Sequence, residues 1–272
     1  MASFEATEDG RSGSSEFFDD FRKSELSLWQ LREDTFPGNL ALFRPSNFVR
    51  RVGRPAEITL KQEDLGVRKY SSAALSSRAR FQYGRFEAVL RPSRVPGVVT
   101  GMFLHRDSPR QEIDIEFVGK RPRQMLTNVF YNPGGDGARF DYGYRGTPVL
   151  VDLGFDATQE LHCYAIEWSP SQLLWYVDGR LVHRRANWEP TPIPHLPMRF
   201  HLNMWPSRSR ELAGRLRDRR LPASCVLVSV RLKSGSVMDF SDKPLGLDTR
   251  PLATKDLTET ASSLLSPVHR NV

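Results

Sequence analysis

One stretch of sequence decides how this chain is interpreted: Gln111-Glu112-Ile113-Asp114-Ile115-Glu116-Phe117-Val118-Gly119. In a β-strand, successive side chains point to opposite faces of the sheet. The three acids therefore share one face, and the apolar residues between them share the other. Three carboxyl groups on one face repel one another and resist burial. A protein tolerates that cost where the face lines a wet, functional cleft.

The spacing of the acids has a chemical use. Cleavage of a glycosidic bond requires one carboxylate as nucleophile or base and a second carboxyl group as proton donor. A third acid between them shares a proton or hydrogen bond and helps to move the two pKa values apart. Along a strand, Glu112 and Glu116 lie roughly 13 Å apart at Cα. A retaining mechanism needs carboxyl groups about 5 to 5.5 Å apart, so we expect the strand to curve until the outer side chains converge.

Two other interpretations of the three acids remain open at this point. A half-buried strand can carry an acidic face that is simply exposed to solvent above an apolar underside. Carboxylate oxygens are also the ligands that calcium prefers. The residues around the stretch are needed to choose between these.

The rest of the chain is typical of an all-β protein. Short apolar runs alternate with Gly, Pro, Asn and Asp turns at intervals of roughly 8 to 15 residues, which indicates a sandwich or barrel. A hairpin is predicted over Gln172–His183, turning at Asp178-Gly179, a pair that tolerates positive φ. We find no long amphipathic helix. The predicted strands are Glu57–Gln62, Gly84–Arg91, Val98–His105, Glu112–Val118, Met125–Phe130, Glu160–Trp168, Leu173–Val177, Met198–Met204 and Cys225–Leu232.

The 272 residues divide into three predicted parts. Residues 1–15 are small and polar and form a flexible segment, and residues 16–233 form the β domain. Residues 234–272 lack strand periodicity and form a tail that is disordered, wraps the core or links to something further. The two cysteines, Cys163 and Cys225, exclude a disulfide scaffold and a four-cysteine metal site. Both are expected to be reduced, with a bridge between them left open.

The net charge of +7 can attract nucleic acid, anionic lipid or acidic polysaccharide. Six arginines gather between Arg208 and Arg220, and a solvated basic loop is the preferred interpretation of them. No helix-turn-helix, zinc-finger or RNA-binding motif supports specific nucleic-acid binding. No apolar run approaches the roughly 18 residues of a membrane helix. We therefore expect neither a nucleic-acid partner nor a membrane span.

The chain resembles glycoside hydrolase family 16, in the branch of bacterial lichenases and plant xyloglucan endotransglycosylases. The stretch from Glu112 to Lys120 is similar to that branch's E-I-D-I/F-E-F-L-G signature. The similarity extends from about Phe17 to Leu232. Its further motifs are Phe17-Phe18-Asp19-Asp20-Phe21, Tyr83-Gly84-Arg85-Phe86-Glu87, Thr127-Asn128-Val129-Phe130, Trp175-Tyr176-Val177-Asp178-Gly179 and Asn203-Met204-Trp205.

The resemblance implies a β-jelly-roll sandwich of two curved antiparallel sheets with a concave substrate cleft. It implies retaining, endo-acting cleavage of a β-glucan, with Glu112 as nucleophile, Glu116 as general acid/base and Asp114 as assisting acid. The expected substrate contacts are Asn128, Trp205, Phe103, Phe130, Asn203 and Trp188. Of these, Trp188 belongs to a loop and is either an outer sugar platform or a loop anchor. Trp168 and Trp175 are expected to pack in the core.

Four places in the sequence, three short segments and one single residue, depart from the family pattern. Arg110 and Gln111 stand where an Asp usually precedes the first catalytic Glu. Ala74-Leu75-Ser76 replaces a Glu-x-Arg pair of sugar contacts, and Glu211-Leu212-Ala213-Gly214 lacks a stacking Trp. Val228 occupies the place of a calcium-binding Asp, which argues against a structural calcium ion. No cofactor is expected. The catalytic acids match the family pattern but these sugar contacts do not, so the resemblance does not imply strict lichenase specificity.

The hypothesis is therefore an endo-glycosidase of family 16 that acts on a mixed-linkage β-glucan or a related polysaccharide. A transglycosylase is the nearest alternative, because the stretch Thr127–Phe130 resembles those enzymes. The Arg patch leaves an acidic exopolysaccharide as a less favoured substrate. A lectin is the alternative from another class, and the presence of all three acids argues against it. We expect a monomer that is secreted or periplasmic, although this sequence carries no signal peptide.

Overall fold

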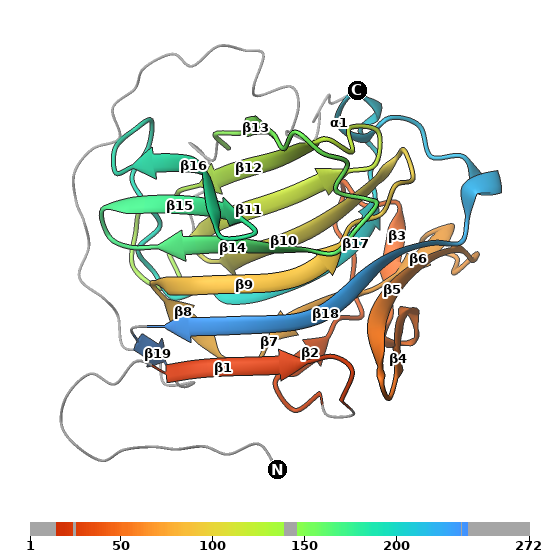
Figure 1. The fold of residues 1–272 in the computed structure, drawn as a ribbon, viewed down its shortest axis with the longest axis horizontal. Helices are drawn as coiled ribbons and strands as arrows, with labels where there is room; N and C mark the ends of the chain where they lie inside the picture. The colour runs from red at the N-terminus through yellow and green to blue at the C-terminus, as the bar shows by residue number, and fades with distance from the viewer. Residues whose placement is uncertain (1–14, 24–25, 139–145, 235, 239–272) are drawn as a thin grey trace.

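The computed structural model describes residues 15–23, 26–138, 146–234 and 236–238, and Figure 1 shows their arrangement. These residues form a sandwich of two curved sheets. The seven-stranded sheet runs in the order β13 (Val149–Asp152), β12 (Gln124–Phe130), β11 (Arg110–Val118), β10 (Val98–Asp107), β17 (Arg199–Pro206), β7 (Ala74–Ser77) and β2 (Trp29–Leu31). All of its neighbouring strands are antiparallel.

The second sheet has ten strands. Its order is β16 (Arg180–Ala186), β15 (Gln172–Val177), β14 (His162–Trp168), β9 (Gly84–Arg91), β18 (Ala223–Ser234), β5 (Arg54–Gln62), β6 (Tyr70–Ser72) and β3 (Ala41–Phe43), with β1 (Ser15–Asp20) beside β18 and β4 (Phe48–Arg51) beside β5. Only the β3–β6 pair is parallel among the described strands. A short pair is formed by β8 (Arg80–Gln82) and β19 (Ser236–Met238). The helical elements described are η1 (Pro45–Asn47), α1 (Arg210–Ala213) and η2 (Asp218–Arg220).

The core lies between the two sheets and explains the alternation seen in the central stretch. Ile113 and Ile115 are fully buried, and Phe117 packs against Tyr164 of the other sheet with ring centroids 4.5 Å apart. Trp175, also from the other sheet, donates its indole N–H to the backbone oxygen of Asp114 at 3.1 Å. The apolar side of β11 is thereby fixed inward, so its acids point outward.

Most sequence-based predictions of the elements are confirmed. Each of the nine predicted strands is present; Gly84–Arg91 has the predicted bounds, and the other eight differ by one to three residues at one or both ends. The hairpin β15–β16 turns at Asp178 and Gly179, which have φ values of 49° and 79°. Trp168 and Trp175 are core residues, each 1% exposed. The short strands β2, β3, β6 and β7 were not predicted, because a strand of three or four residues is too short to show alternation.

Three further expectations concern the cysteines and the ends of the chain. Cys163 and Cys225 are both free thiols, and Cys225 is buried. Ser236–Met238, inside the predicted tail, form β19 and pair with β8, so the tail begins as a strand. The rest of the tail and residues 1–14 lie outside the described residues. No helix among the described residues is long and apolar enough to cross a membrane.

Candidate active site

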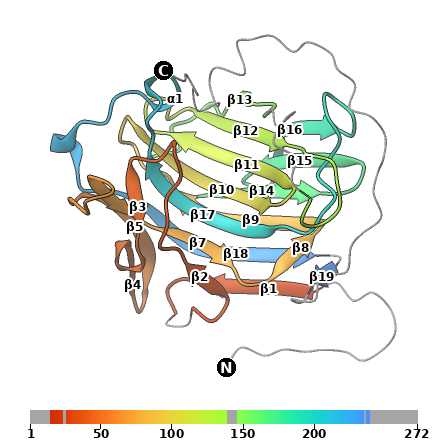
Figure 2. The ribbon, with the colours of Figure 1, turned by 180° about the vertical axis from the view of Figure 1, so that it is seen from behind.

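The three acids lie together on the outer face of β11, at the middle of the seven-stranded sheet. Figure 2 shows β11 beside β10 and β12, all following the curve of the sheet. Across the strand pairs, Glu112 is opposite His105, Asp114 is opposite Phe103 and Glu116 is opposite Gly101. On the other side the partners of the same acids are Phe130, Asn128 and Leu126. Because cross-strand partners share a face, these residues surround the acids.

Burial and mutual repulsion set the protonation of two of the acids. Glu112 is 9% exposed and Asp114 is 5% exposed. Burial, followed by the charges of Glu112 and Glu116, raises the pKa of Asp114 well above its usual range. Burial, followed by the charge of Glu112, raises the pKa of Glu116 to about 7. A carboxyl group with that pKa holds a proton near neutrality and can also release it, as a general acid/base must.

Arg110, two residues before the first acid on the same face, bonds Glu112. Its Nη2 and Nε donate to Oε2 of Glu112 at 2.7 and 3.1 Å. The guanidinium also lies over the ring of Phe130, 5.1 Å from its centroid. The pair places a positive charge beside Glu112, whereas Glu116 is flanked by Gly101 and Leu126. The two outer acids therefore have opposite surroundings.

Two asparagines border the acids, as predicted from the resemblance. Asn128, 2% exposed, makes a side-chain hydrogen bond with Asp114, which lowers the pKa of that acid in opposition to burial. Asn203, 7% exposed, lies across from Gly101. The Oδ1 atoms of both asparagines have no hydrogen-bond partner among the described residues. Because an unpaired buried oxygen costs free energy, these oxygen atoms are suited to accept hydrogen bonds from the hydroxyl groups of a sugar.

Gly101 has a steric role beside Glu116. A Cβ atom at this position would lie 2.6 Å from Oδ1 of Asn203. Any side chain would push into the space between Asn203 and Glu116. The glycine therefore keeps the floor of the site open.

Phe103 and Phe130 also lie on the acidic face, and they pack against polar groups. The ring of Phe103 stacks on the imidazole of His201, with centroids 4.8 Å apart and planes 10° apart. Phe130 lies under Arg110, as described above. Both predicted residues are thus brought to the acids.

The two predicted tryptophans differ in their placement. Trp205 lies on the acidic face but is only 8% exposed, because it belongs to an apolar cluster at the Glu116 end. Its ring meets Phe36 edge-on, with centroids 5.0 Å apart. Trp188 follows β16 of the other sheet, in a turn where its φ is 67°. It does not belong to the face that carries the acids, and its role as an outer sugar platform or loop anchor stays open.

The sequence reasoning missed two histidines of this face, His105 and His201. His105 is opposite Glu112, and His201 is opposite Phe103. Burial lowers the pKa of the His201 imidazole well below its usual range, and the neighbouring charges of His105 and Arg32 lower this pKa further. Both positions are two residues from predicted contacts, so strict alternation from Phe103 and Asn203 identifies them.

Gln111, the second departure from the family pattern, has a structural role. Its side chain is fully buried, and its Oε1 accepts hydrogen bonds from the backbone N–H groups of His195 at 3.0 Å and Leu196 at 3.2 Å. Its Nε2 donates to the backbone oxygen of Asn132 at 2.9 Å. The residue therefore fixes the start of β11 to two loops.

Val228 stands where the resemblance places a calcium-binding Asp. Val228 lies in an irregularity of β18, and its side chain carries no oxygen that could hold a metal. Its backbone oxygen is the one oxygen atom it has, and that atom accepts a hydrogen bond from the N–H of Phe21 at 2.9 Å. In the described part of the chain, no group of three or more His, Cys, Asp or Glu side chains is arranged as metal ligands.

Comparison with known proteins agrees with this geometry. The sequence profile of glycosyl hydrolases family 16 matches residues 44–217. The β-glucanase of Bacillus subtilis strain 168 is 30% identical over 207 residues, which cover 74% of this chain and 78% of that protein. The solved β-glucanase of Bacillus licheniformis has a TM-score of 0.70 and 26% identity, covering 81% of this chain and 97% of that one. A β-1,3-1,4-glucanase (lichenase) from a mouse hindgut metagenome has a TM-score of 0.70 and 25% identity, covering 80% and 98%. The expected jelly roll is confirmed, and the chain belongs to glycosyl hydrolases family 16.

Proposed function

We propose that this protein is a retaining endo-β-glucanase that hydrolyses internal bonds of a mixed-linkage or related β-glucan. The observation that carries the proposal is the contrast between two carboxyl groups on one strand. Glu112 is bonded by Arg110, while burial raises the pKa of Glu116 to about 7. Such a contrast separates a nucleophile from a proton donor. The relatives that carry the name β-glucanase support the same substrate class.

In the proposed mechanism, a carboxylate oxygen of Glu112 attacks the anomeric carbon of the sugar. The bond from that carbon to the glycosidic oxygen breaks, and Glu116 gives its proton to the departing oxygen. Water then attacks the glycosyl-enzyme while Glu116 takes back a proton, which restores both groups. Asp114, between them, has a pKa raised by burial and by the two neighbouring charges. Its proton forms a hydrogen bond to the nucleophile until the attack begins.

We propose that these carboxyl groups act without a cofactor. Transfer of a glycosyl group between a carboxylate and an oxygen involves no change of oxidation state, and the proton moves through Glu116. The side chains of Asn128 and Asn203 offer unpaired oxygens to the sugar next to the broken bond. A metal ion has no part in these steps.

Transglycosylation is the second candidate. The stretch Thr127–Phe130, which favours it, lies in β12 directly beside the acids. In that reaction a sugar hydroxyl takes the place of water, and Glu116 removes its proton in the same way. The carboxyl chemistry is identical, so only the acceptor distinguishes the two activities.

The test is product analysis with barley mixed-linkage glucan, xyloglucan and laminarin. We expect shorter chains and new reducing ends from at least one glucan, and Glu112→Gln lowers turnover by at least about 10³-fold. Glu57→Gln, an exposed acid on β5 of the other sheet, is the matched control with full activity. Redistributed chain lengths without new reducing ends would establish the transglycosylase. Binding without any change in the chains would establish a lectin and refute both.

The proposed location of the enzyme follows from its proposed substrate. We propose a monomer that acts outside the cytoplasm, because β-glucans of cell walls are found there. Activity measured in periplasmic and culture fractions, with light scattering on the purified protein, tests both statements. Activity confined to the cytoplasm, or a stable dimer, would contradict them.

A further inference from the structure

A buried arginine, Arg185, lies where the two sheets meet at one side of the sandwich. It belongs to β16, which lies close to β12 and β13 in both views of the ribbon (Figures 1 and 2). Its cross-strand partner is Leu173, a fully buried core residue. Because cross-strand partners share a face, the side chain of Arg185 points inward between the sheets, and the residue is only 6% exposed.

The guanidinium of Arg185 bonds two threonines from different segments. Its Nη1 donates to Oγ1 of Thr147 at 2.5 Å. Its Nη2 donates to the backbone oxygen of Thr191 at 3.1 Å and also to the hydroxyl of that residue. All of these acceptors are uncharged, and burial lowers the pKa of Arg185 to about 10 with no contribution from a carboxylate. Within the described part of the chain, the residue is therefore a buried cation that is charged near neutral pH and forms no ion pair.

A buried cation without a counter-charge is costly. An apolar side chain of similar volume avoids that desolvation cost and is often as stable or more stable in such a place. Stability alone therefore does not account for an arginine here. What an arginine supplies, and an apolar residue does not, is a fixed planar fork of donors that holds two segments at once.

The first arm of the fork fixes the chain before β13 to β12. The hydroxyl of Thr147, which accepts from Arg185, donates in turn to the backbone oxygen of Val129 at 3.2 Å. The backbone N–H of Thr147 donates to the same oxygen, also at 3.2 Å. The hydroxyl group therefore connects Arg185 to a strand that borders the acids.

Gly146 brings this segment against the acidic face. It pairs with Phe130 in an isolated β-bridge. A Cβ atom on Gly146 would lie 2.8 Å from Oδ1 of Asn128 and 2.8 Å from the ring of Phe130, so its backbone is packed against both side chains. Asn128 is opposite Asp114, and Phe130 is opposite Glu112. A displacement of Gly146 is thus passed to the neighbours of two of the acids.

The second arm reaches the start of β11. Thr191 lies in the loop between β16 and β17, which also contains His195 and Leu196. The backbone N–H groups of His195 and Leu196 donate to Oε1 of Gln111 at 3.0 and 3.2 Å. Gln111 directly precedes Glu112 in the chain. Both arms therefore end on neighbours of the acids, one through β12 and the other through this loop.

We infer that Arg185 is a positioning residue of the active site. Its fork ties the chain before β13 to the loop after β16, and it thereby holds Asn128 and Gln111 in place beside the acids of β11. The inference rests on the proposed function, because the geometry that Arg185 maintains is that of glycosyl transfer. In such a reaction, a misplacement of about 1 Å caused by a distant mutation can cost on the order of 10²-fold in rate.

The test compares methionine variants of two neighbouring arginines on β16. Arg185→Met keeps an unbranched side chain but removes the fork, and we expect kcat for β-glucan to fall by at least about 10-fold, a larger factor than any change in KM. Arg184→Met is the matched control with unaltered kcat, because Arg184 is exposed on the opposite side of the strand. Each variant is assayed well below its thermal midpoint, so that lost stability alone leaves kcat unchanged. Equal kcat values, or a change in KM alone, would overturn the inference.

Two variants at Thr147 test the first arm with Arg185 in place. Thr147→Val removes the hydroxyl and lowers kcat, whereas Thr147→Ser keeps the hydroxyl and retains kcat. In Arg185→Met/Thr147→Val, we expect kcat close to that of Arg185→Met alone, because both changes cut the same connection. Losses that multiply in the double variant would show that the two residues act separately, which contradicts the inference.

Hydrogen exchange tests both arms even if no glucan is cleaved. The amide of Thr147 is bonded on the first arm, and those of His195 and Leu196 on the second. We expect these amides to exchange at least about 10-fold faster in Arg185→Met than in Arg184→Met, the order of one lost hydrogen bond. Unchanged exchange overturns the inference whether or not the proposed function holds. Faster exchange in a protein that cleaves no glucan refutes the proposed function and still supports the connection made by Arg185.

Discussion

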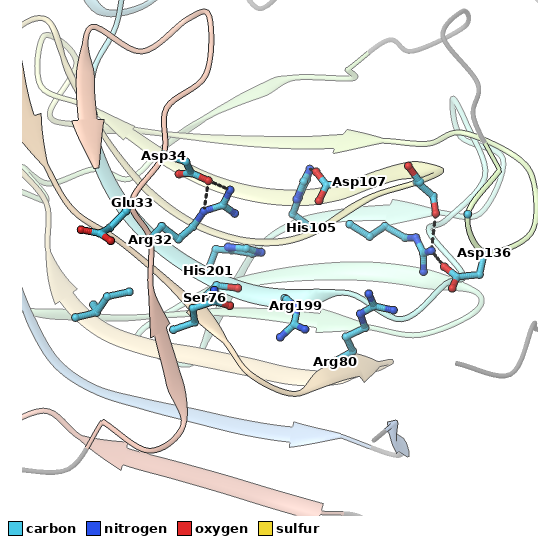
Figure 3. A pocket seen from close by; sticks show the side chains of 15 residues that line it. Arg32, Glu33, Asp34, Ser76, Arg80, His105, Asp107, Asp136, Arg199 and His201 are labelled. Carbon is cyan, nitrogen blue, oxygen red and sulfur yellow. Dashed lines mark hydrogen bonds and ion pairs between the residues drawn. The ribbon is translucent and has the colours of Figure 1, made fainter. Parts of the chain in front are cut away.

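The two ends of the acidic face differ sharply, although the same strands build both. Around Glu116 the face closes into an apolar cluster of eight buried residues: Phe43, Ala74, Val99, Val118, Leu126, Trp205, Leu212 and Ala213. Around Glu112 the neighbours are charged or polar: Arg110 bonds the acid itself, and His105, opposite it, lines a cavity of about 660 Å³ (Figure 3). The neighbours of one acid are apolar and those of the other are charged, although the side chain of Glu116 is itself more exposed than that of Glu112.

This difference shows how one strand prepares two carboxyl groups for opposite tasks. A proton donor is needed where burial raises the pKa, as the surroundings of Glu116 do. A nucleophile is needed where a cation accompanies the carboxylate, as Arg110 does for Glu112. The spacing of the acids along β11 places each in its own surroundings. Variants that exchange or remove those surroundings test the comparison.

The largest effect is expected from loss of the proton donor. Glu116→Gln lowers kcat/KM for β-glucan by on the order of 10³-fold, because the departing oxygen is no longer protonated. With an aryl oligosaccharide whose leaving group needs no proton, the first step recovers to within about 10-fold of the wild-type rate. Release of the aryl group in a rapid-mixing experiment measures that step.

Glu112→Gln is the matched variant for that experiment, because it removes the acid at the other end. Its rate does not recover with the aryl substrate, since no covalent bond to the anomeric carbon can form. Recovery in both variants, or in neither, would contradict the roles assigned to the two ends. In wild-type protein, activity falls as the pH rises through about 7, because Glu116 then loses its proton.

The apolar end is expected to contribute mainly to stability. Trp205→Ala lowers the free energy of unfolding by about 3 kcal/mol, because it leaves a hole against Phe36 and the cluster. Trp205→Phe lowers it by less, since the phenyl ring fills part of the space. Urea unfolding measures both. If Trp205 also contacts sugar, KM rises in both variants, whereas a purely structural Trp205 changes stability with KM unaltered.

The sequence carries the fold and the acids more clearly than their surroundings. The alternation of acidic and apolar residues predicted β11 and its two faces, because Ile113 and Ile115 are buried in the core. The register between strands is a long-range property, so nothing local showed that His105 lies opposite Glu112. The cavity is still less local, because Arg32, Arg80 and Arg199 come from three distant segments. Trp188 follows β16 in a turn, in agreement with the prediction that it belongs to a loop.

A smaller effect is expected from the cation at the Glu112 end. Arg110→Gln lowers kcat/KM by about 10-fold, because the hydrogen bonds that hold Glu112 are lost and one positive charge is removed. The same charge also lowers the pKa of Asp114, so in Arg110→Gln this acid keeps its proton to higher pH and the pH–rate profile shifts in that direction. Arg110→Lys keeps the charge and restores the wild-type pH profile, while the loss in kcat/KM persists. An identical pH profile in both variants would show that the charge of Arg110 has no part in catalysis.

The smallest effect, and one of opposite sign, is expected at the acid between the two ends. Asp114→Asn abolishes the shared proton but stabilises the fold by about 1 kcal/mol, a rise of about 2 to 4 °C in the thermal midpoint. Burial, then the charges of Glu112 and Glu116, raises the folded-state pKa of Asp114 above its unfolded value of 3.8. As pH rises above 3.8, the unfolded chain releases the proton first and the folded state loses relative stability. The gain from Asn is therefore absent near pH 3, grows above pH 4 and persists at pH 7.

Asp20→Asn is the control of opposite sign, because hydrogen bonds from Arg22 lower the pKa of Asp20 and that contribution is lost in the variant at neutral pH. Thermal midpoints measured from pH 3 to pH 8 decide the matter: a loss of stability in Asp114→Asn at neutral pH would mean that its contact with Asn128 outweighs the repulsion among the three acids.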